Sequence, residues 1–191
     1  MIKRYPKRNS VLGLMLHALI TYMIYVLPYF RGLYSFAGES LIIASISCLS
    51  ALHGFGIGAL ASFISPISSL AILNTSPLDI NMILQRILQP FVKYVVVAGF
   101  VGILVDTPEK IGRIALWTYL SLIIQSLVTA SILGNPDYYL NTFLPQSSLE
   151  YISASLITLE LVFPYSFLAK ILEKTLRGAR KASSRPKSPS K

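Results

Sequence analysis

Residues 37–73 read AGESLIIASISCLSALHGFGIGALASFISPISSLAIL, an apolar run with one acid, Glu39, and no lysine or arginine. A helix that crosses a bilayer needs about 20 mostly apolar residues. The run is therefore too long for one crossing, and a pair of helices at 37–52 and 55–73 is the natural solution. Gly54, beside His53, lies where the turn between them would fall. These residues predict a helical hairpin within a membrane.

The rest of the chain has a similar composition. Of its 191 residues, 53% are hydrophobic and only 13% are charged, whereas a soluble domain carries about 25% charged residues. This excludes a soluble enzyme of average type. Four further apolar segments approach or exceed the length of a crossing, namely 11–30, 90–106, 112–134 and 150–172. We therefore expect an all-α polytopic membrane protein with six transmembrane helices.

The charges are concentrated at the two ends of the chain. The formal net charge is +9, and 12 of the 17 lysines and arginines lie before residue 9 or after residue 169. With both termini in the cytoplasm, 14 cations fall on the inner side and two, Arg31 and Arg86, on the outer side. Cytoplasmic loops of membrane proteins carry such an excess. The pattern predicts a multi-pass protein of the cell membrane with both termini cytoplasmic.

The same distribution suggests a domain organisation. We expect a basic cytoplasmic N-terminal tail at 1–10, the six-helix domain at 11–177 and a disordered basic cytoplasmic C-terminal tail at 178–191. The basic tails can contact anionic headgroups of the lipid bilayer. They do not form the folded basic face that a nucleic-acid partner would need, so no nucleic acid is expected.

Few residues suit metal or catalytic chemistry. The single cysteine, Cys48, and two distant histidines, His17 and His53, cannot form a Cys/His metal cluster. His17 lies in an apolar segment, where a packing role and a functional role both stay open. The chain has no GxxxxGK[ST], HExxH or GxSxG motif. We therefore expect no metal, no cofactor and no enzymatic activity.

Three small residues in the second half of the hairpin have a separate interpretation. Gly54, Gly58 and Ser62 recur every four residues, the small-xxx-small pattern that lets membrane helices approach closely. We expect them to be helix-packing residues.

Polar residues inside apolar segments are the candidates for binding, because a charge at the bilayer centre costs about 2.5–3.5 kcal/mol. The expected topology places four such residues in the outer half of the bilayer: Glu39, Lys93, Gln125 and Glu160. Together they could line one substrate-binding cavity. Alternatively, Glu39 and Lys93 extend to the headgroups. Glu160 is too deep for that, and it is the strongest single candidate.

A resemblance follows from this layout and from one local motif. Short inner connections and long outer loops at 31–36, 74–89 and 135–149 resemble the substrate-binding S components of energy-coupling factor (ECF) transporters. Residues 36–65 look like the second and third helices of that group, where an acid-bearing start precedes a glycine-rich helix.

Within this group the chain is most similar to the queuosine-precursor (QueT-type) family. Phe36, Glu39 and Leu41 match part of that family's Phe-Arg-x-Ser-Glu-Ala-Leu segment, and Asp79 matches a later aspartate. The arginine of the segment is absent, and Ser40 follows Glu39 instead of preceding it.

The resemblance implies a membrane-embedded subunit that captures a vitamin or a related, purine-like precursor from outside. Its partners would be a transmembrane T component and cytoplasmic ATPases, which drive the transport of the small-molecule solute. The alternative is a polytopic scaffold or assembly subunit without a small-molecule ligand. In that case Glu39, Lys93 and Glu160 would pair with one another or with partner helices.

Overall fold

The computed structural model describes residues 7–26, 37–73, 88–105, 111–133, 137 and 144–183. These residues contain six helices and no strand, which confirms the all-α prediction for the described part of the chain. The helices are α1 (Lys7–Val26), α3 (Glu39–His53), α4 (Phe55–Leu73), α6 (Gln89–Leu104), α7 (Ile111–Leu133) and α9 (Leu144–Ser183).

The predicted hairpin is present as α3 and α4, and its turn is a single residue. Gly54 has φ 90°, a left-handed conformation that costs a glycine little because it has no Cβ. Its N–H donates to the carbonyl oxygen of Ser50 at 2.8 Å and so caps α3. Gly54 thus forms the turn, which is a different role from the helix packing expected of it.

Gly58 lies at a point where α4 closely approaches both α3 and α6. A Cβ added to it would lie 1.9 Å from Ser50 Oγ and 3.0 Å from Ala98 Cβ, so α3 and α6 both pack against this point. One turn further along, the buried Ser62 hydroxyl donates to the Gly58 carbonyl oxygen at 2.9 Å. Small residues therefore allow three helices to meet here.

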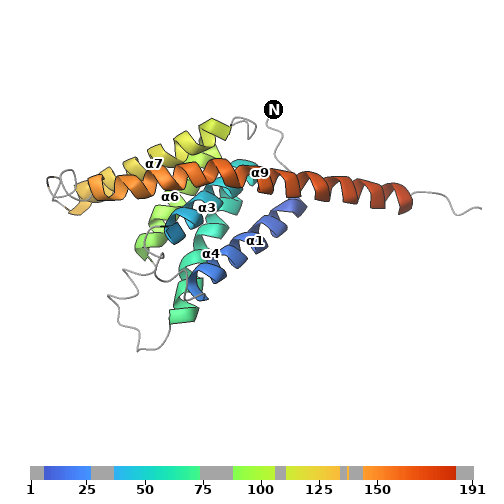
Figure 1. Cartoon of the computed structure of the whole chain (residues 1–191), viewed down its shortest axis with the longest axis horizontal. Helices are drawn as coiled ribbons and strands as arrows, with labels where there is room; N and C mark the ends of the chain where they lie inside the picture. The colour runs from blue at the N-terminus through green and yellow to red at the C-terminus, as the bar shows by residue number, and fades with distance from the viewer. Residues whose placement is uncertain are drawn as a thin grey trace, which may run out of the picture.

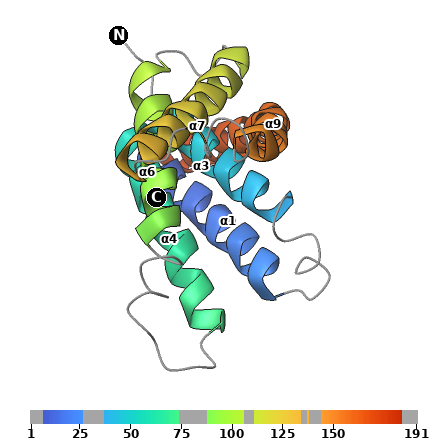
Figure 2. The same ribbon diagram turned by 90° about the vertical axis from the view of Figure 1, so that its left-hand side faces the viewer.

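Helix α3 lies at the centre of the bundle (Figures 1 and 2). It contacts α1, α4, α6, α7 and α9. Of its 15 residues, 12 are buried, including four serines: Ser40, Ser45, Ser47 and Ser50. A helix surrounded on all sides needs small side chains to let its neighbours approach, and this accounts for the serine-rich sequence of α3.

Helix α9 is longer than the sequence predicts. It packs along α7 and α3, and its C-terminal part extends beyond the rest of the bundle (Figure 1). The predicted sixth helix was 150–172, with disorder from 178, but the structure is helical from Leu144 to Ser183. The disorder expected for 178–183 is therefore wrong, because alanine, lysine and arginine favour helix. Residues 184–191 lie outside the described part.

The N-terminal boundary also differs from the prediction. Helix α1 begins at Lys7, so residues 7–10 of the expected basic tail belong to the first helix. The amide groups of a first turn need no intrahelical partner and tolerate many residue types. The long outer loops at 31–36 and 74–87, and the part of the third at 138–143, lie outside the described residues.

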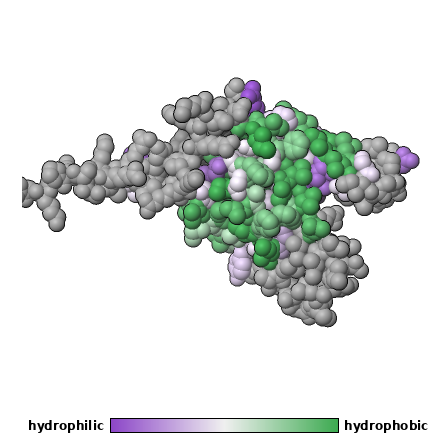
Figure 3. All heavy atoms as spheres, turned by 180° about the vertical axis from the view of Figure 1, so that it is seen from behind, coloured by the Kyte–Doolittle hydropathy of each residue, from purple (hydrophilic) through white to green (hydrophobic). Residues whose placement is uncertain are grey.

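The face of the bundle shown in Figure 3 is largely apolar where the structure describes it. Met15 and Ile103 are each 65% exposed, and other large hydrophobic side chains are exposed on α1, α4, α6, α7 and α9, whereas the central α3 exposes none. The buried polar residues are instead serines, threonines and one histidine. A soluble fold buries its large apolar side chains preferentially, so this distribution is typical of a bundle surrounded by an apolar medium.

The helices differ in the length of their apolar segments. Among the described residues, one segment, Gly112–Ser131, is long and apolar enough to cross a bilayer. Four other apolar segments have 10–17 residues: Ser10–Tyr25, Glu39–His53, Phe55–Ser68 and Pro90–Leu104. Six full crossings therefore remain a prediction.

Candidate functional site

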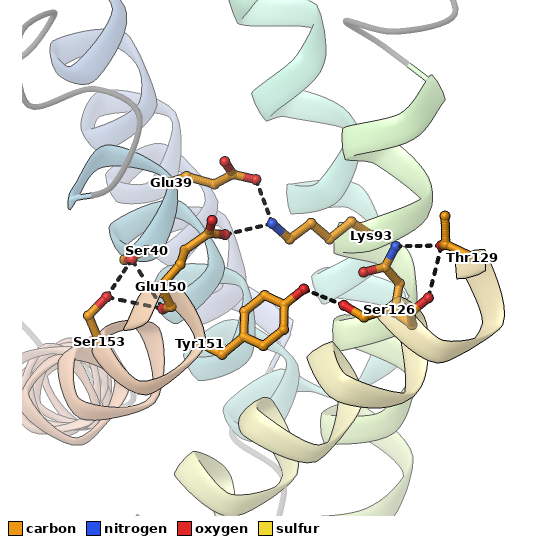
Figure 4. A network of polar contacts seen from close by, with 9 residues as sticks. Glu39, Ser40, Lys93, Ser126, Thr129, Glu150, Tyr151 and Ser153 are labelled. Carbon is orange, nitrogen blue, oxygen red and sulfur yellow. Dashed lines mark hydrogen bonds and ion pairs between the residues drawn. The ribbon is translucent and has the colours of Figure 1, made fainter. Parts of the chain in front are cut away.

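Three charged side chains meet at one end of the bundle (Figure 4). Lys93 Nζ donates to Glu39 Oε1 at 2.8 Å and to Glu150 Oε1 at 2.6 Å. Glu39 is the first residue of α3, Lys93 lies near the start of α6, and Glu150 lies near the start of α9. The three helices thus begin at the same end, and one ammonium group joins all of them. We call these residues the ionic cluster.

The ionic cluster is largely removed from solvent. The side chains of Lys93 and Glu150 are each 15% exposed, and that of Glu39 is 32% exposed. Two carboxylates and one ammonium give it a formal charge of −1. The positive end of a helix dipole favours Glu39 at the start of α3 and disfavours Lys93 near the start of α6. The lysine therefore depends on its two carboxylate partners.

A hydroxyl network surrounds the ionic cluster. The Tyr151 hydroxyl is hydrogen-bonded to Ser126 of α7, and Lys93 Nζ lies 5.8 Å from the centre of the Tyr151 ring. Ser40 Oγ lies 2.7 Å from Ser153 Oγ, and both hydroxyls donate to the Glu150 carbonyl oxygen. Helices α3, α6, α7 and α9 therefore all contribute polar groups to this end of the bundle.

The structure brings together two of the four predicted binding residues. Glu39 and Lys93 are in direct contact. Gln125 lies beside Ser126 in the sequence, but its amide nitrogen donates to Thr129 Oγ1 of the same helix at 3.0 Å. This bond lies within α7 and does not join Gln125 to the ionic cluster.

Glu160 is not part of this site, contrary to the prediction. The inward face of α9 consists of Tyr151, Ala154, Thr158 and Val162, all of which are at most 2% exposed. Their spacing of three and four residues defines one side of a helix. Glu160 lies off that side and is exposed. The prediction used only the depth of Glu160 in the bilayer. It did not take into account which side of α9 the residue lies on.

Glu150 was missed by the sequence analysis. It is the first residue of the predicted 150–172 helix and was not among the candidate binding residues. The signal that could have found it is shared with Glu39 and Lys93: each is a charged residue near the start of a strongly apolar helix. When three helices with a charged residue near their N-terminus begin at the same end of a bundle, these charged side chains can come together.

A second polar group lies in the core, around His17. This histidine is fully buried, and its Nε2 lies 3.0 Å from both the Ala61 carbonyl oxygen and Ser65 Oγ. A carbonyl only accepts, so Nε2 carries the hydrogen and Nδ1 accepts from Ser45 Oγ at 2.9 Å. Both ring nitrogens are thus engaged by α3 and α4. The packing role left open for His17 fits this geometry.

The described residues contain no group of three or more His, Cys, Asp or Glu side chains that could hold a metal ion. No family model, curated protein or solved structure matches this chain. The features that bear on its function are therefore the ionic cluster and the exposed apolar side chains.

Proposed function

We propose that the chain is a polytopic protein of the cell membrane whose ionic cluster captures a small polar solute. The membrane placement is supported by the exposed apolar side chains on the five helices that surround α3 and by the serine, threonine and histidine groups buried between the helices. Membrane helices pack through small and hydroxyl residues, because lipid already solvates their apolar side chains. The cation excess supports placing the ionic cluster at the outer end.

The chemistry of the ionic cluster favours a solute with both donors and acceptors. Carboxylates accept hydrogen bonds from ring N–H and amino groups, and an ammonium group donates to a carbonyl oxygen. Purine-like bases and several vitamins carry both kinds of group. Glu39, the most exposed of the three charges at 32%, is the group that a solute would contact first.

Uptake would need partners. The chain has no phosphate-binding loop, so energy would come from cytoplasmic ATPases through a transmembrane T component, as in the S components that the sequence resembles. The observation that carries the proposal is the partly buried ionic cluster at one end of an apolar bundle.

A thermal-shift experiment on the purified protein in detergent tests the capture of a solute. Guanine, adenine, thiamine, riboflavin and biotin serve as probes. A ligand at about 100 times its Kd stabilises the folded state by about 2.7 kcal/mol, which raises the Tm of a chain of this size by roughly 5–10 °C. We expect at least one probe to produce such a shift.

The variant Glu39→Gln keeps the size of the side chain and removes its charge. We expect it to abolish the ligand-induced shift, whereas Asp137→Asn, an exposed acid outside the ionic cluster, should retain it. Absence of a shift with every probe would count against the capture of this class of solute.

One observation favours the second candidate, a scaffold without a ligand. Lys93 already satisfies carboxylates from two other helices, so the ionic cluster could serve only to join α3, α6 and α9. In that case Glu39→Gln would lower the Tm and the membrane abundance of the protein, and no probe would stabilise either form.

A further inference from the structure

Glu160 interrupts an exposed apolar stripe on α9. The stripe consists of Leu149, Ile152, Leu156, Phe167 and Ile171, which are 64%, 45%, 57%, 63% and 46% exposed. Successive members, with Glu160 included, are three, four or seven residues apart, the spacing of one face of a helix. We call this face the α9 stripe. It faces away from Tyr151, Ala154, Thr158 and Val162, which pack into the bundle.

The depth of Glu160 makes the stripe unusual. Glu160 lies ten residues after Glu150 and ten residues before Lys170, a separation of about 15 Å from each along the helix. If α9 crosses a bilayer whose apolar core is about 30 Å thick, Glu160 lies at its centre. A glutamate side chain is too short to reach either headgroup layer from there.

We infer that the α9 stripe is the docking surface for a transmembrane helix of a different protein that carries a lysine or arginine at the matching depth. The inference rests on the membrane placement proposed above. Ionisable groups within a bilayer are costly, and they pair with one another instead of facing lipid. The apolar residues on both sides of Glu160 supply the packing surface, and its carboxylate supplies the specificity through charge complementarity.

A second copy of this chain fits the stripe poorly. In a two-fold symmetric contact Glu160 would face Glu160, and the two carboxylates would repel each other. Lys93 is held by Glu39 and Glu150. The other lysines and arginines of the described residues lie at the start of α1 or α7 or from Lys170 onward in α9. None of these described cations lies at the depth of Glu160, so we place the matching cation on another protein.

Reconstitution with model helices tests this inference. The purified protein is placed in vesicles of phosphatidylcholine and phosphatidylglycerol with synthetic leucine–alanine helices that carry lysine, glutamate or leucine at the centre. A fluorophore on Leu156→Cys, in a Cys48→Ala background, reports proximity to a labelled helix. The matched control carries the fluorophore on Leu19→Cys, which lies on the exposed apolar face of α1.

We expect the helix with a central lysine to bind at least about fivefold more tightly than the helix with leucine, the scale of one interhelical polar contact in a bilayer. The signal should arise at position 156 and not at position 19. Glu160→Gln should remove the preference, and Glu160→Lys should transfer it to the helix with a central glutamate. This charge reversal distinguishes recognition by Glu160 from general apolar association.

Two results would overturn the inference. Equal binding of the lysine and leucine helices would do so, and so would a preference that persists in Glu160→Gln. In both cases the protein still floats with the vesicles, and the membrane placement is retained. A protein that fails to float with them would overturn the membrane placement, and the inference with it.

Discussion

Lys93 is the residue on which the polar end of the bundle depends. Its ammonium group separates two carboxylates from different helices. In Lys93→Met the apolar stem is kept, but Glu39 and Glu150 face each other without a cation. Breaking a fully buried pair costs about 3–5 kcal/mol. We expect a loss of about 2–3 kcal/mol in the free energy of unfolding, because the ionic cluster keeps some solvent. Thermal unfolding in detergent should show a Tm lowered by roughly 5 °C or more.

Two further variants make this prediction specific. Lys174→Met removes an exposed lysine of α9 and should leave the Tm unchanged. Lys93→Met combined with Glu39→Gln and Glu150→Gln removes the uncompensated charges and should regain most of the loss. If Lys93→Met behaves like Lys174→Met, the ionic cluster does not stabilise the bundle.

The sequence identified Glu39 and Lys93 but misplaced Glu160 for a physical reason. A charged residue in an apolar segment is visible in any sequence, and its depth follows from its position along the helix. The side of the helix on which it lies cannot be deduced from the sequence in this case. In α9 the buried side holds Ala154 and Val162, and the exposed side holds Leu156 and Phe167. Both faces are apolar, so hydrophobic periodicity could not distinguish inside from outside.

The α3–α4 hairpin depends on glycines that differ in their surroundings. A Cβ at Gly58 would lie 1.9 Å from Ser50 Oγ, whereas a Cβ at Gly56 would meet nothing within 4 Å. Gly58→Ala should therefore lower the free energy of unfolding by about 1–2 kcal/mol, the cost of overpacking less the gain in helix propensity. Gly56→Ala should leave the Tm unchanged or raise it slightly. Thermal unfolding of the two variants measures the difference.

A compensating substitution tests the cause. Ser50→Gly removes both side-chain atoms nearest to the added Cβ and leaves Ala98 Cβ at 3.0 Å. Combined with Gly58→Ala, it should recover part of the lost stability relative to Ser50→Gly alone. No recovery would mean that the close approach of α3 and α4 is not what makes Gly58 necessary.

The helices differed in how far their ends could be predicted. The turn at Gly54 was found because an apolar run of nearly twice the length of one crossing requires a break, and glycine is the residue that permits it. The end of α9 was not found, because a basic, non-apolar segment was equated with disorder. Helix formers such as Ala179 and Lys181 can continue an existing helix without any apolar face.

The whole molecule has a polar end and a basic end. The ionic cluster lies where α3, α6 and α9 begin, and the cations of α9 lie at the opposite end of that helix. The excess of lysine and arginine in the tails predicts that the basic end faces the cytoplasm. The orientation matters for function, because only an outward-facing ionic cluster could meet an extracellular solute.

Cysteine labelling in intact cells tests this orientation. The only native cysteine, Cys48, is completely buried, so the parent protein should not react with a membrane-impermeant maleimide. Asp137→Cys lies between α7 and α9 at the polar end, and Ser183→Cys ends the basic part of α9. We expect the first to be labelled in intact cells and the second only after permeabilisation. Labelling of Ser183→Cys alone in intact cells would invert the topology and place the ionic cluster in the cytoplasm, where it could not capture a solute from outside.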